Sequence, residues 1–503
     1  MSTLKKFAGQ TVIYGLSTVL SRVLSFLLTK LYVKLYPTKV YGVFINMYAW
    51  ASILNAVLAF GMETTFFRYL NKPGQDKEKV YSNTFIIILF LCSIFLVIAF
   101  VFSGNIALWM LSDDTTSLSD YEQYIRFFIL ILVVDSLSVI PFARLRADGR
   151  PLRFGMIRVL NILSFIGFNL FLLVTIPDII ASKGFLADYF TPWYREGWLG
   201  YVFISNLIAS CLTLLFLLPE FRKLKFSFDK PLILDMLSYS FPVLIANLSF
   251  IINENSDKIF LKELLPPNIG AQEAGIYGAC GKIAIFLSIF IQAFRLGAEP
   301  FFFSHAKNKN SGETYSKIMN YFIMAISLIF VGIAANIEIL KHFIGSDNPV
   351  QRELYWSGLK IIPILLLGYV SLGIYMNLSI WYKLSDQTRF GLYISGIGAI
   401  LTIVLNVLFI PKYGYIASAW ISFTAYTTMM VMSYLMGQKH YPIPYDVKKA
   451  LVYLSTAVII VIISYHFLNR NLIAGNILFI AFAAGLAYVE RTDLRKIITG
   501  NIH

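Results

Sequence analysis

Charged residues are scarce in this chain. They make up 14% of its 503 residues, whereas about a quarter of a typical soluble domain is charged. Hydrophobic residues account for 57%, and the mean hydropathy is +0.69. This balance excludes an ordinary soluble protein. It predicts an all-α polytopic membrane protein, because helices satisfy their own backbone hydrogen bonds inside a bilayer.

Residues that carry catalytic or metal chemistry are also few. Cys92, Cys211 and Cys280 lie in apolar segments without a CxxC or Cys/His spacing, so neither a disulfide framework nor a metal site is expected. The 5 histidines are scattered, and no GxxxxGK[ST] stretch is present for ATP hydrolysis. We therefore expect a transporter rather than an enzyme, with no cofactor.

The chain has a net charge of +14. A basic balance can indicate nucleic-acid binding, but in a polytopic membrane protein Lys and Arg collect in the cytoplasmic segments. No nucleic-acid partner is therefore expected.

Apolar segments of bilayer length recur along the whole chain. A window of about 19 residues finds about fourteen of them. The first is too long for a signal peptide and carries Arg22 and Lys30, so it is expected to be a retained span. The predicted spans lie near residues 8–33, 41–67, 80–102, 123–143, 153–177, 197–218, 232–261, 274–303, 315–337, 356–382, 388–410, 414–436, 448–468 and 472–489.

The distribution of charge between the spans predicts their orientation. Lys and Arg are in clear excess in the segments on the side of the N-terminus, which predicts that both termini are cytoplasmic. Segment Ser103–Gln123, on the other side, has four acidic residues and neither Lys nor Arg. The longest outer segment, Pro177–Gly197, is rich in aromatic residues. It suits an element lying in the outer headgroups, or alternatively a lid over a substrate portal.

Two sets of six spans resemble each other. Arg153-Phe154-Gly155 opens the fifth span and Arg389-Phe390-Gly391 the eleventh, while Tyr41-Gly42-Val43-Phe44 opens the second and Ala274-Gly275-Ile276-Tyr277 the eighth. Six is an even number, so the repeats share one topology and are related by an axis along the membrane normal. The predicted organisation is an N-lobe (1–218), a basic cytoplasmic linker (219–231), a C-lobe (232–437), and two further spans with a cytoplasmic C-terminus (438–503).

Two spans carry polar stripes at helical spacing. In the eighth span, Gly278, Gly281, Ser288, Gln292, Arg295 and Glu299 share one face of a helix, and in the first span Thr11, Gly15, Thr18, Arg22, Ser25 and Thr29 do so. A charge near the hydrocarbon core is costly, which favours a shared polar cavity. The alternative is close packing at the glycines, with an internal i,i+4 pair between Arg295 and Glu299.

At this point the chain resembles the multidrug/oligosaccharidyl-lipid/polysaccharide flippase superfamily, and within it the polysaccharide transporters that include the O-antigen flippases. The resemblance covers nearly the whole chain. It is carried by the two lobes with two additional spans, Ser21-Arg22-Val23-Leu24 in the first span, Asp257-Lys258 in the seventh and Ala274-Gly275-Ile276-Tyr277 in the eighth.

The resemblance implies a flippase of the bacterial inner membrane. Its substrate would be an undecaprenyl-diphosphate-linked oligosaccharide, turned from the cytoplasmic to the periplasmic leaflet during lipopolysaccharide or other polysaccharide biosynthesis. Membrane lipid and a polysaccharide polymerase are the further partners, and a monomer is expected. Alternatives are a lipid II flippase, a cation-coupled drug antiporter and a membrane enzyme of polysaccharide assembly. Lipid II flippases typically have a second arginine where this chain has Leu27 and Leu28. The antiporters rely on acids in the first lobe, whereas the first span here carries Arg22 and no acid.

Charged residues inside the spans are the candidate site. Arginine presents a planar fork to phosphate oxygens, and lysine presents a point charge. The expected substrate-binding residues are Arg22, Arg295, Lys282 and Glu254. Asp135, Glu63 and Glu299 are expected to couple an ion or to form structural ion pairs, and Asp135 suits a proton site and a counterion equally. Lys30, Arg126, Arg158 and Lys360 lie near span ends and are expected to extend to the membrane surface.

The fourteen-span topology can be tested with reporter fusions. A reporter placed after Lys225 should be cytoplasmic, and one placed within residues Ser112–Ser119 should be periplasmic. Paired phosphatase and fluorescent-protein fusions measure both positions. Placement of the two sites on one side, or in the reverse order, would contradict the topology.

Overall fold

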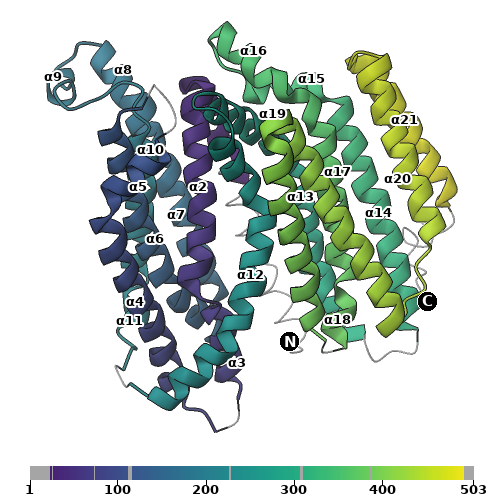
Figure 1. Cartoon of the computed structure of the whole chain (residues 1–503), viewed down its shortest axis with the longest axis horizontal. Helices are drawn as coiled ribbons and strands as arrows, with labels where there is room; N and C mark the ends of the chain where they lie inside the picture. The colour runs from purple at the N-terminus through teal and green to yellow at the C-terminus, as the bar shows by residue number, and fades with distance from the viewer. Residues whose placement is uncertain are drawn as a thin grey trace. The chain divides into compact units, whose positions relative to one another are not determined.

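The computed structural model describes residues 23–24, 26–72, 74–111, 116–225, 228–305, 310–385 and 387–491. This part of the chain is built from helices and contains no β-strand. The predicted all-α membrane fold is confirmed. Contacts divide the chain into two compact units: unit 1 comprises Met1–Gly275 with Thr402–Gly414, and unit 2 comprises Ile276–Leu401 with Tyr415–His503. Within each unit the long helices run side by side (Figure 1).

Unit 1 contains the helices of the first half of the chain. Residues 26–35 are helical and precede α2. The further elements are α2 (Thr38–Ala59), α3 (Met62–Leu70), α4 (Lys77–Val101), α5 (Ser103–Met110), α6 (Leu118–Ala147), α7 (Pro151–Leu170), the π-helix η1 (Phe171–Thr175), α8 (Ile176–Ala181), α9 (Ala187–Phe190), α10 (Gly200–Phe216), α11 (Leu218–Phe221) and α12 (Lys230–Leu264).

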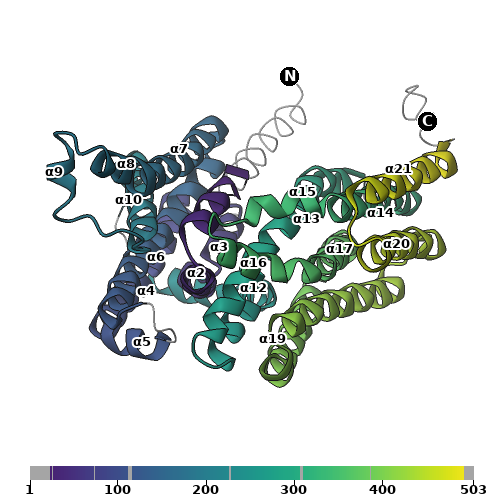
Figure 2. The same ribbon diagram turned by 90° about the horizontal axis from the view of Figure 1, so that it is seen from above.

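Unit 2 contains most of the second half, and two long helices, α13 and α19, contribute to both units. Figure 2 shows α14, α20 and α21 side by side in this unit. Its elements are α13 (Ile269–His305), α14 (Ser311–Ala335), α15 (Ile337–Leu340), η2 (Lys341–Ile344), α16 (Pro349–Ser357), η3 (Gly358–Ile361), α17 (Ile362–Leu378), α18 (Ile380–Leu384), α19 (Arg389–His440), α20 (Val447–Ile462), η4 (Ile463–Phe467) and α21 (Leu472–Val489).

Among the described residues, 11 helical segments are long and apolar enough to cross a membrane. The apolar α10, at 17 residues, falls just short of that length. The predicted spans 388–410 and 414–436 form the single 52-residue element α19, in which Gly414 has a non-helical backbone and separates two helical segments. Most of the first predicted span lies outside the described residues. The count of fourteen therefore stays a prediction.

The boundary between the units lies at Gly275 and not at the predicted basic linker. The contacts place α12, the predicted seventh span, with the helices of the first six, because α12 packs along α2 and α3. Contacts show which helices pack together, but they do not show whether two sets of helices are related by symmetry. The six-plus-six organisation therefore stays a prediction.

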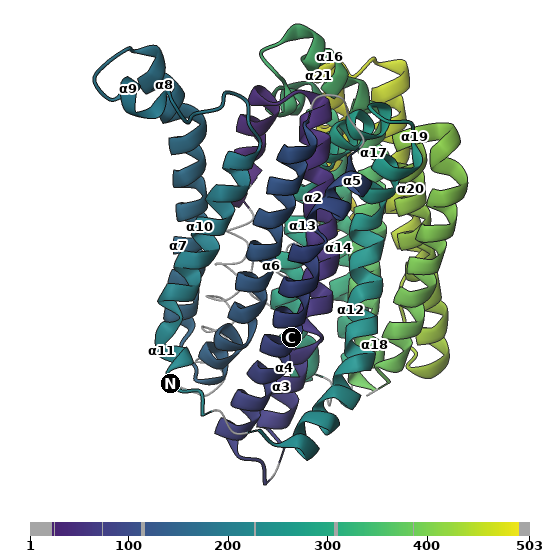
Figure 3. The same ribbon diagram turned by 60° about the vertical axis from the view of Figure 1, so that its left-hand side comes forward.

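The aromatic outer segment forms a short helical arm. Figures 1 and 3 show α8 and α9 extending beyond the end of α7. Phe185 is 93% exposed and Tyr189 is 71% exposed. Arg195 and Trp198 hold the base of the arm, because both contact the carboxylate of Asp120 at the start of α6. Exposed aromatic residues at the end of a span suit the headgroup region, and the lid remains the alternative.

A network of ion pairs connects α4, α6, α7 and the segment around α11 at the end of unit 1 opposite the arm. Glu220 of α11 is fully buried and pairs with Arg153 at 3.2 Å and with Lys223. Arg144, near the end of α6, pairs with Glu78 of α4 at 2.7 Å and with Asp148 at 2.9 Å. This network fastens the beginning of the basic linker to α4, α6 and α7.

Two glycines from the predicted repeats meet at a helix crossing. A Cβ atom on Gly42 of α2 would overlap the carbonyl oxygen of Ala271, and a Cβ atom on Gly275 of α13 would overlap the carbonyl oxygen of Thr38. Each glycine lies four residues after the carbonyl that the other glycine meets, since Thr38 precedes Gly42 and Ala271 precedes Gly275 by the same step. Such reciprocity is what a two-fold axis between equivalent segments produces. Small residues let the two backbones approach closely.

This crossing predicts an unusual response to alanine. Gly42→Ala should lower the thermal unfolding temperature, because added volume at a backbone–backbone contact costs about 1–3 kcal/mol. The matched control is Gly167→Ala in α7, where a Cβ meets open space and helix propensity alone should leave stability unchanged or raised. Unfolding of the purified variants in detergent measures both. Equal stability of Gly42→Ala and the wild type would contradict the close contact.

Candidate functional site

A polar cavity of about 420 Å³ lies inside unit 1. Four helices form its wall, and a fifth helix contributes one side chain. Its lining comprises Ser52, Asn55, Ala56 and Ala59 of α2; Asp135, Ser136, Ser138, Val139 and Phe142 of α6; Arg158 and Asn161 of α7; Asn206, Ser210 and Thr213 of α10; and Ile251 of α12. Most of these residues are polar although their helices are apolar.

Asp135 and Arg158 are the two charged groups of the lining. Asp135 is half-buried near the middle of α6, and Ser210 of α10 lines the same cavity. Arg158 attracts this carboxylate electrostatically. Within the described part of the chain, no direct salt bridge joins the two side chains, so the attraction acts without direct contact.

The position of Arg158 adds a cation to the cavity. We expected its side chain to extend to the membrane surface, and in the structure it is an exposed residue that lines the cavity. The guanidinium carbon lies 4.4 Å from the centre of the Phe142 ring and 5.6 Å from that of Phe154. A cation over an aromatic face gains about 0.5–2 kcal/mol. The two rings and Asp135 together stabilise the charge of Arg158 in the cavity.

The uncharged polar groups are ordered by a few hydrogen bonds. Asn161 donates to the Ala209 carbonyl at 3.1 Å and to the Thr213 hydroxyl at 2.9 Å. Asn206 donates to the Tyr48 hydroxyl at 2.8 Å. These bonds connect α7 with α10 and α10 with α2. They hold the amide groups in fixed positions around the space between Asp135 and Arg158.

This arrangement suits a proton or a small polar guest better than a large anion. One carboxylate and one guanidinium give a balanced charge, and the neighbouring hydroxyl and amide oxygens are acceptors for a proton-carrying group or a hard cation. The described residues contain no group of three or more His, Cys, Asp or Glu side chains placed to hold a metal ion.

The structure separates the residues predicted from sequence. Among the predicted residues whose side chains the structure describes, Asp135 alone lines the cavity. Glu63 of α3 forms an ion pair with Arg146 at the end of α6. Glu254 is half-buried in α12, and its backbone carbonyl accepts a 2.7 Å hydrogen bond from Lys258. Arg22 lies outside the described residues.

The remaining predicted residues belong to α13. Lys282 is half-buried. Arg295 is exposed, and its guanidinium lies 4.0 Å from the Met376 sulfur of α17. The side chain of Glu299 lies outside the described part of the structure, so its predicted pair with Arg295 stays a prediction.

A sequence signal for the missed residues was present. Ser52 and Asn55 of α2, and Asn206, Ser210 and Thr213 of α10, follow the same three- and four-residue spacing that marked the first and eighth spans. Such short stripes recur along many membrane helices, and spacing alone does not reveal which stripes face each other. The tertiary structure brings the stripes of α2, α6, α7 and α10 together around one cavity.

Comparison with known proteins identifies the family. The profile described as "Polysaccharide biosynthesis protein" matches residues 7–304, more than half of the chain. The chain belongs to this family. The profile of the MatE family also matches, over residues 242–408. A search of curated protein sequences gives no significant match.

Solved structures show the same fold at low sequence identity. The lipid II flippase MurJ in an inward closed conformation matches with a TM-score of 0.73 and 16% identity, covering 96% of this chain and 100% of that one. An inward-facing multidrug resistance transporter of the MATE family matches with a TM-score of 0.61 and 14% identity, over 85% of this chain and 94% of that one. A transporter of the same superfamily from Pyrococcus furiosus matches with a TM-score of 0.58 and 15% identity, covering 86% of this chain and 95% of that one.

These findings confirm the predicted superfamily and the broad class of function. The chain is a multi-pass membrane protein of the multidrug/oligosaccharidyl-lipid/polysaccharide superfamily, whose members are flippases and transporters. At this level of identity the solved structures show the fold, and they do not transfer a substrate.

Electrostatic coupling across the cavity predicts a non-additive pair of mutations. Asp135→Asn leaves the Arg158 cation without its counter-charge, whereas the double variant Asp135→Asn/Arg158→Gln removes both charges. The double variant should therefore be more stable than the sum of the single changes predicts, by about 0.5–3 kcal/mol. Thermal unfolding of the four proteins measures this coupling energy. Strict additivity would show that the two charges do not interact.

Proposed function

We propose that this protein flips a polyprenyl-diphosphate-linked oligosaccharide from the cytoplasmic to the periplasmic leaflet of the bacterial inner membrane. The observation that carries the proposal is the match of residues 7–304 to the polysaccharide biosynthesis protein family. The fold, shared with the lipid II flippase MurJ, supports it. Such a substrate joins a hydrocarbon chain to a charged, hydrated head, so the protein must carry the head through the membrane while the chain stays in lipid.

In this proposal, intramembrane cations receive the diphosphate. Arg22 and Arg295 can each offer two parallel N–H donors to phosphate oxygens, and Lys282 adds a point charge. Glu254 would accept hydrogen bonds from sugar hydroxyls. Alternating access then moves this polar surface from one side of the membrane to the other.

The cavity in unit 1 has a separate role in this proposal. Asp135 and Arg158 both line it and attract each other, and no salt bridge joins them in the described part of the chain. Protonation of Asp135, or binding of a cation beside it, would cancel that attraction. The cavity is therefore suited to couple transport to an ion gradient by changing how firmly α6 and α7 are held together.

A cation-coupled small-molecule antiporter is the second candidate. The MatE profile match over residues 242–408 and the fold of MATE transporters favour it. A lipid II flippase is the third, supported by the fold of MurJ but opposed by Leu27 and Leu28 at the place of a second arginine. These candidates differ in substrate, so one experiment separates them.

The deciding experiment follows lipid-linked glycans in cells depleted of the protein. Our proposal predicts that the polyprenyl-linked oligosaccharide accumulates on the cytoplasmic leaflet, while lipid II translocation and drug export are unchanged. Leaflet position is read by accessibility to a glycosidase added to intact spheroplasts and to everted vesicles. Unchanged delivery of the oligosaccharide together with lost lipid II translocation or lost drug efflux would replace the proposal by the corresponding alternative.

Arg22 provides a residue-level test. An arginine deep in the membrane costs at least ~2.5 kcal/mol, which a diphosphate-binding surface would offset. Arg22→Ala should reduce transport at least about tenfold at normal membrane abundance, and Arg22→Lys should restore part of it because bidentate geometry is lost. Lys30→Ala is the matched control, since Lys30 belongs to the same predicted span and is exposed. Full transport by Arg22→Ala would exclude substrate contact, and loss of the protein from the membrane would indicate a structural role.

A further inference from the structure

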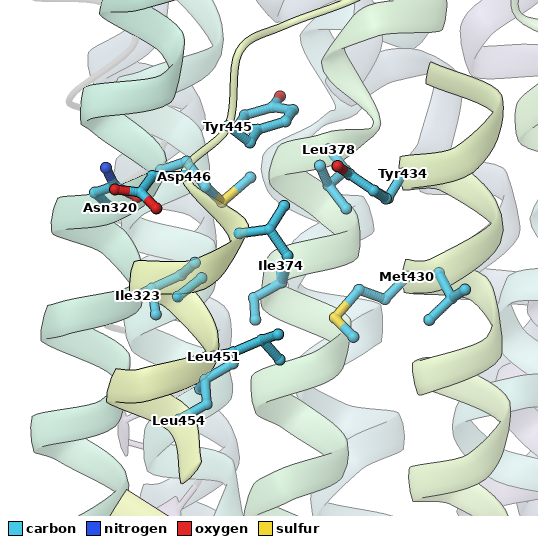
Figure 4. Close-up of a pocket in the computed structure, with 14 residues that line it drawn as sticks. Asn320, Ile323, Ile374, Leu378, Met430, Tyr434, Tyr445, Asp446, Leu451 and Leu454 are labelled. Carbon is cyan, nitrogen blue, oxygen red and sulfur yellow. The ribbon is translucent and has the colours of Figure 1, made fainter. Parts of the chain in front are cut away.

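Two apolar surfaces lie outside the polar cavity. One lines a pocket of about 210 Å³ in unit 2, between α14, α17, α19 and α20 (Figure 4). Its surface is almost wholly apolar, so it does not distinguish one apolar guest from another. The other surface belongs to the arm of α8 and α9 in unit 1. There the apolar side chains are joined by tyrosine and tryptophan, whose rings combine an apolar body with a polar tip.

The arm presents an exposed aromatic face. Phe185, Leu186, Tyr189 and Trp193 are all exposed. Phe and Leu side chains gain stability only where an apolar environment covers them. Tyr and Trp are enriched at the two interfaces between membrane and water, because their rings bury the apolar body and leave the polar tip hydrated. This combination suits the boundary between acyl chains and headgroups.

The level of the arm in the bilayer follows from the length of α7. This helix has 20 residues, Pro151–Leu170, and is therefore about 30 Å long, the thickness of the hydrocarbon core. It begins at the ion-pair network, where Arg153 pairs with Glu220. At its other end, the Phe190 ring of α9 packs on Phe171, with 6.3 Å between the ring centres. This contact places α9 at the opposite boundary of the hydrocarbon core, on the predicted outer side.

The arm continues a surface that already faces lipid. Of the residues in the most apolar stretch of Pro151–Ala181, 28% are buried within the protein. The exposed ones include Leu163, Leu170 and Phe171. Because exposed Phe171 contacts Phe190 of α9, the lipid-facing side of α7 and the aromatic face of the arm meet in space.

Ring contacts hold the arm in a defined shape. Phe190 contacts Trp193 with 5.6 Å between ring centres, and Tyr194 stacks on Tyr201 of α10 at 5.0 Å. The backbone N–H of Arg195 donates a 2.8 Å hydrogen bond to the Tyr201 hydroxyl. The exposed face is therefore presented by a preformed scaffold, which lowers the entropic cost of binding a surface.

The charges of the arm are nearly balanced. Its exposed acids are Asp178, Asp188 and Glu196, and its exposed bases are Lys183 and Arg195. Arg195 is engaged, because it pairs with Asp120 at 2.6 Å. A segment that binds anionic lipid by charge carries a cluster of Lys and Arg, which this arm does not have. Contact with the membrane is therefore expected to be apolar and independent of lipid charge.

The direction of the arm separates a membrane anchor from a lid. Figures 2 and 3 place α9 outside the bundle of α2, α6, α7 and α10, at the rim of unit 1. A lid over the polar cavity would have to lie across the helices that line it. The arm extends away from them, in the direction in which unit 1 meets lipid.

We propose that the arm is an anchor in the outer leaflet, with Phe185, Leu186, Tyr189 and Trp193 inserted at the boundary between acyl chains and phospholipid headgroups. The anchor fixes the level of the outer end of α7, the helix that carries Arg158. The proposal concerns the lipid bilayer and not the transported substrate, so it stands or fails independently of the proposed transport function.

Depth-dependent quenching tests the position of the face. Cys211 is the exposed cysteine, and Cys92 and Cys280 are buried, so Cys211→Ser provides a background for labelling. A fluorophore on Tyr189→Cys of the full-length protein in liposomes should be quenched most strongly by lipids with a nitroxide near the top of the acyl chain. Lys183→Cys, an exposed charged position of the arm, is the matched control and should be quenched more by aqueous iodide. If Tyr189→Cys does not fold, Leu186→Cys serves instead.

The outcomes of this experiment are decisive. Shallow nitroxide quenching at Tyr189, unchanged when anionic lipid is added to the liposomes, supports the anchor. Quenching at Tyr189 by iodide and not by any lipid nitroxide would overturn it, as a lid or a docking surface for a soluble partner predicts. Quenching that requires anionic lipid would overturn the apolar mode of binding.

Protease access measures how firmly the face is held. In spheroplasts, trypsin added from outside should cleave after Lys183 on the order of tenfold faster in Leu186→Ser/Tyr189→Ser than in the wild type, because the two changes remove apolar surface that lipid covers. Asp188→Ser changes an exposed polar residue of the same helix and should be cleaved at the wild-type rate. Equal cleavage of the wild type and the double variant would contradict the anchor.

Discussion

Internal satisfaction of hydrogen bonds is the constraint on which this structure depends, because the hydrocarbon core of a bilayer offers no partners. Helices meet this constraint for the backbone. Many polar side chains meet it on their own helix, as Ser52 does with the Tyr48 carbonyl, Ser138 with that of Val134 and Asn169 with that of Phe165. Such residues cost little inside a span and can be distributed freely along it.

Charged side chains also pair between elements, and these pairs fasten helices together. Glu220 is fully buried and pairs with Arg153 and Lys223, which fastens α7 and α11 together. Asp135 and Arg158 differ, because both line the cavity and no salt bridge joins them in the described part of the chain. Direct pairs stabilise one arrangement of the helices. A separated pair leaves room for a proton or an ion to change the balance, which suits a transporter.

The glycine crossing and the polar cavity both involve α2. Gly42 and Gly275 bring α2 and α13 into backbone contact, and the reciprocal overlap with Ala271 and Thr38 is the geometry of a two-fold relation. The cavity belongs mainly to α2, α6, α7 and α10, and its residues lie between the two glycines in the sequence. The helix α2 therefore contributes both to the close crossing and to the cavity wall.

Sequence alone determined the class of protein, because hydropathy over a span of about twenty residues and the scarcity of charge both follow from the bilayer itself. It also predicted Gly42 and Gly275 as equivalent positions of a repeat, and the structure places both at one close helix crossing. It did not reveal that Arg158 lines the same cavity as Asp135. Spacing along a helix shows which residues share a face, whereas the partner of that face is decided by packing between helices far apart in the chain. Only the tertiary structure brings α6, α7 and α10 together, and with them the charges that define the site.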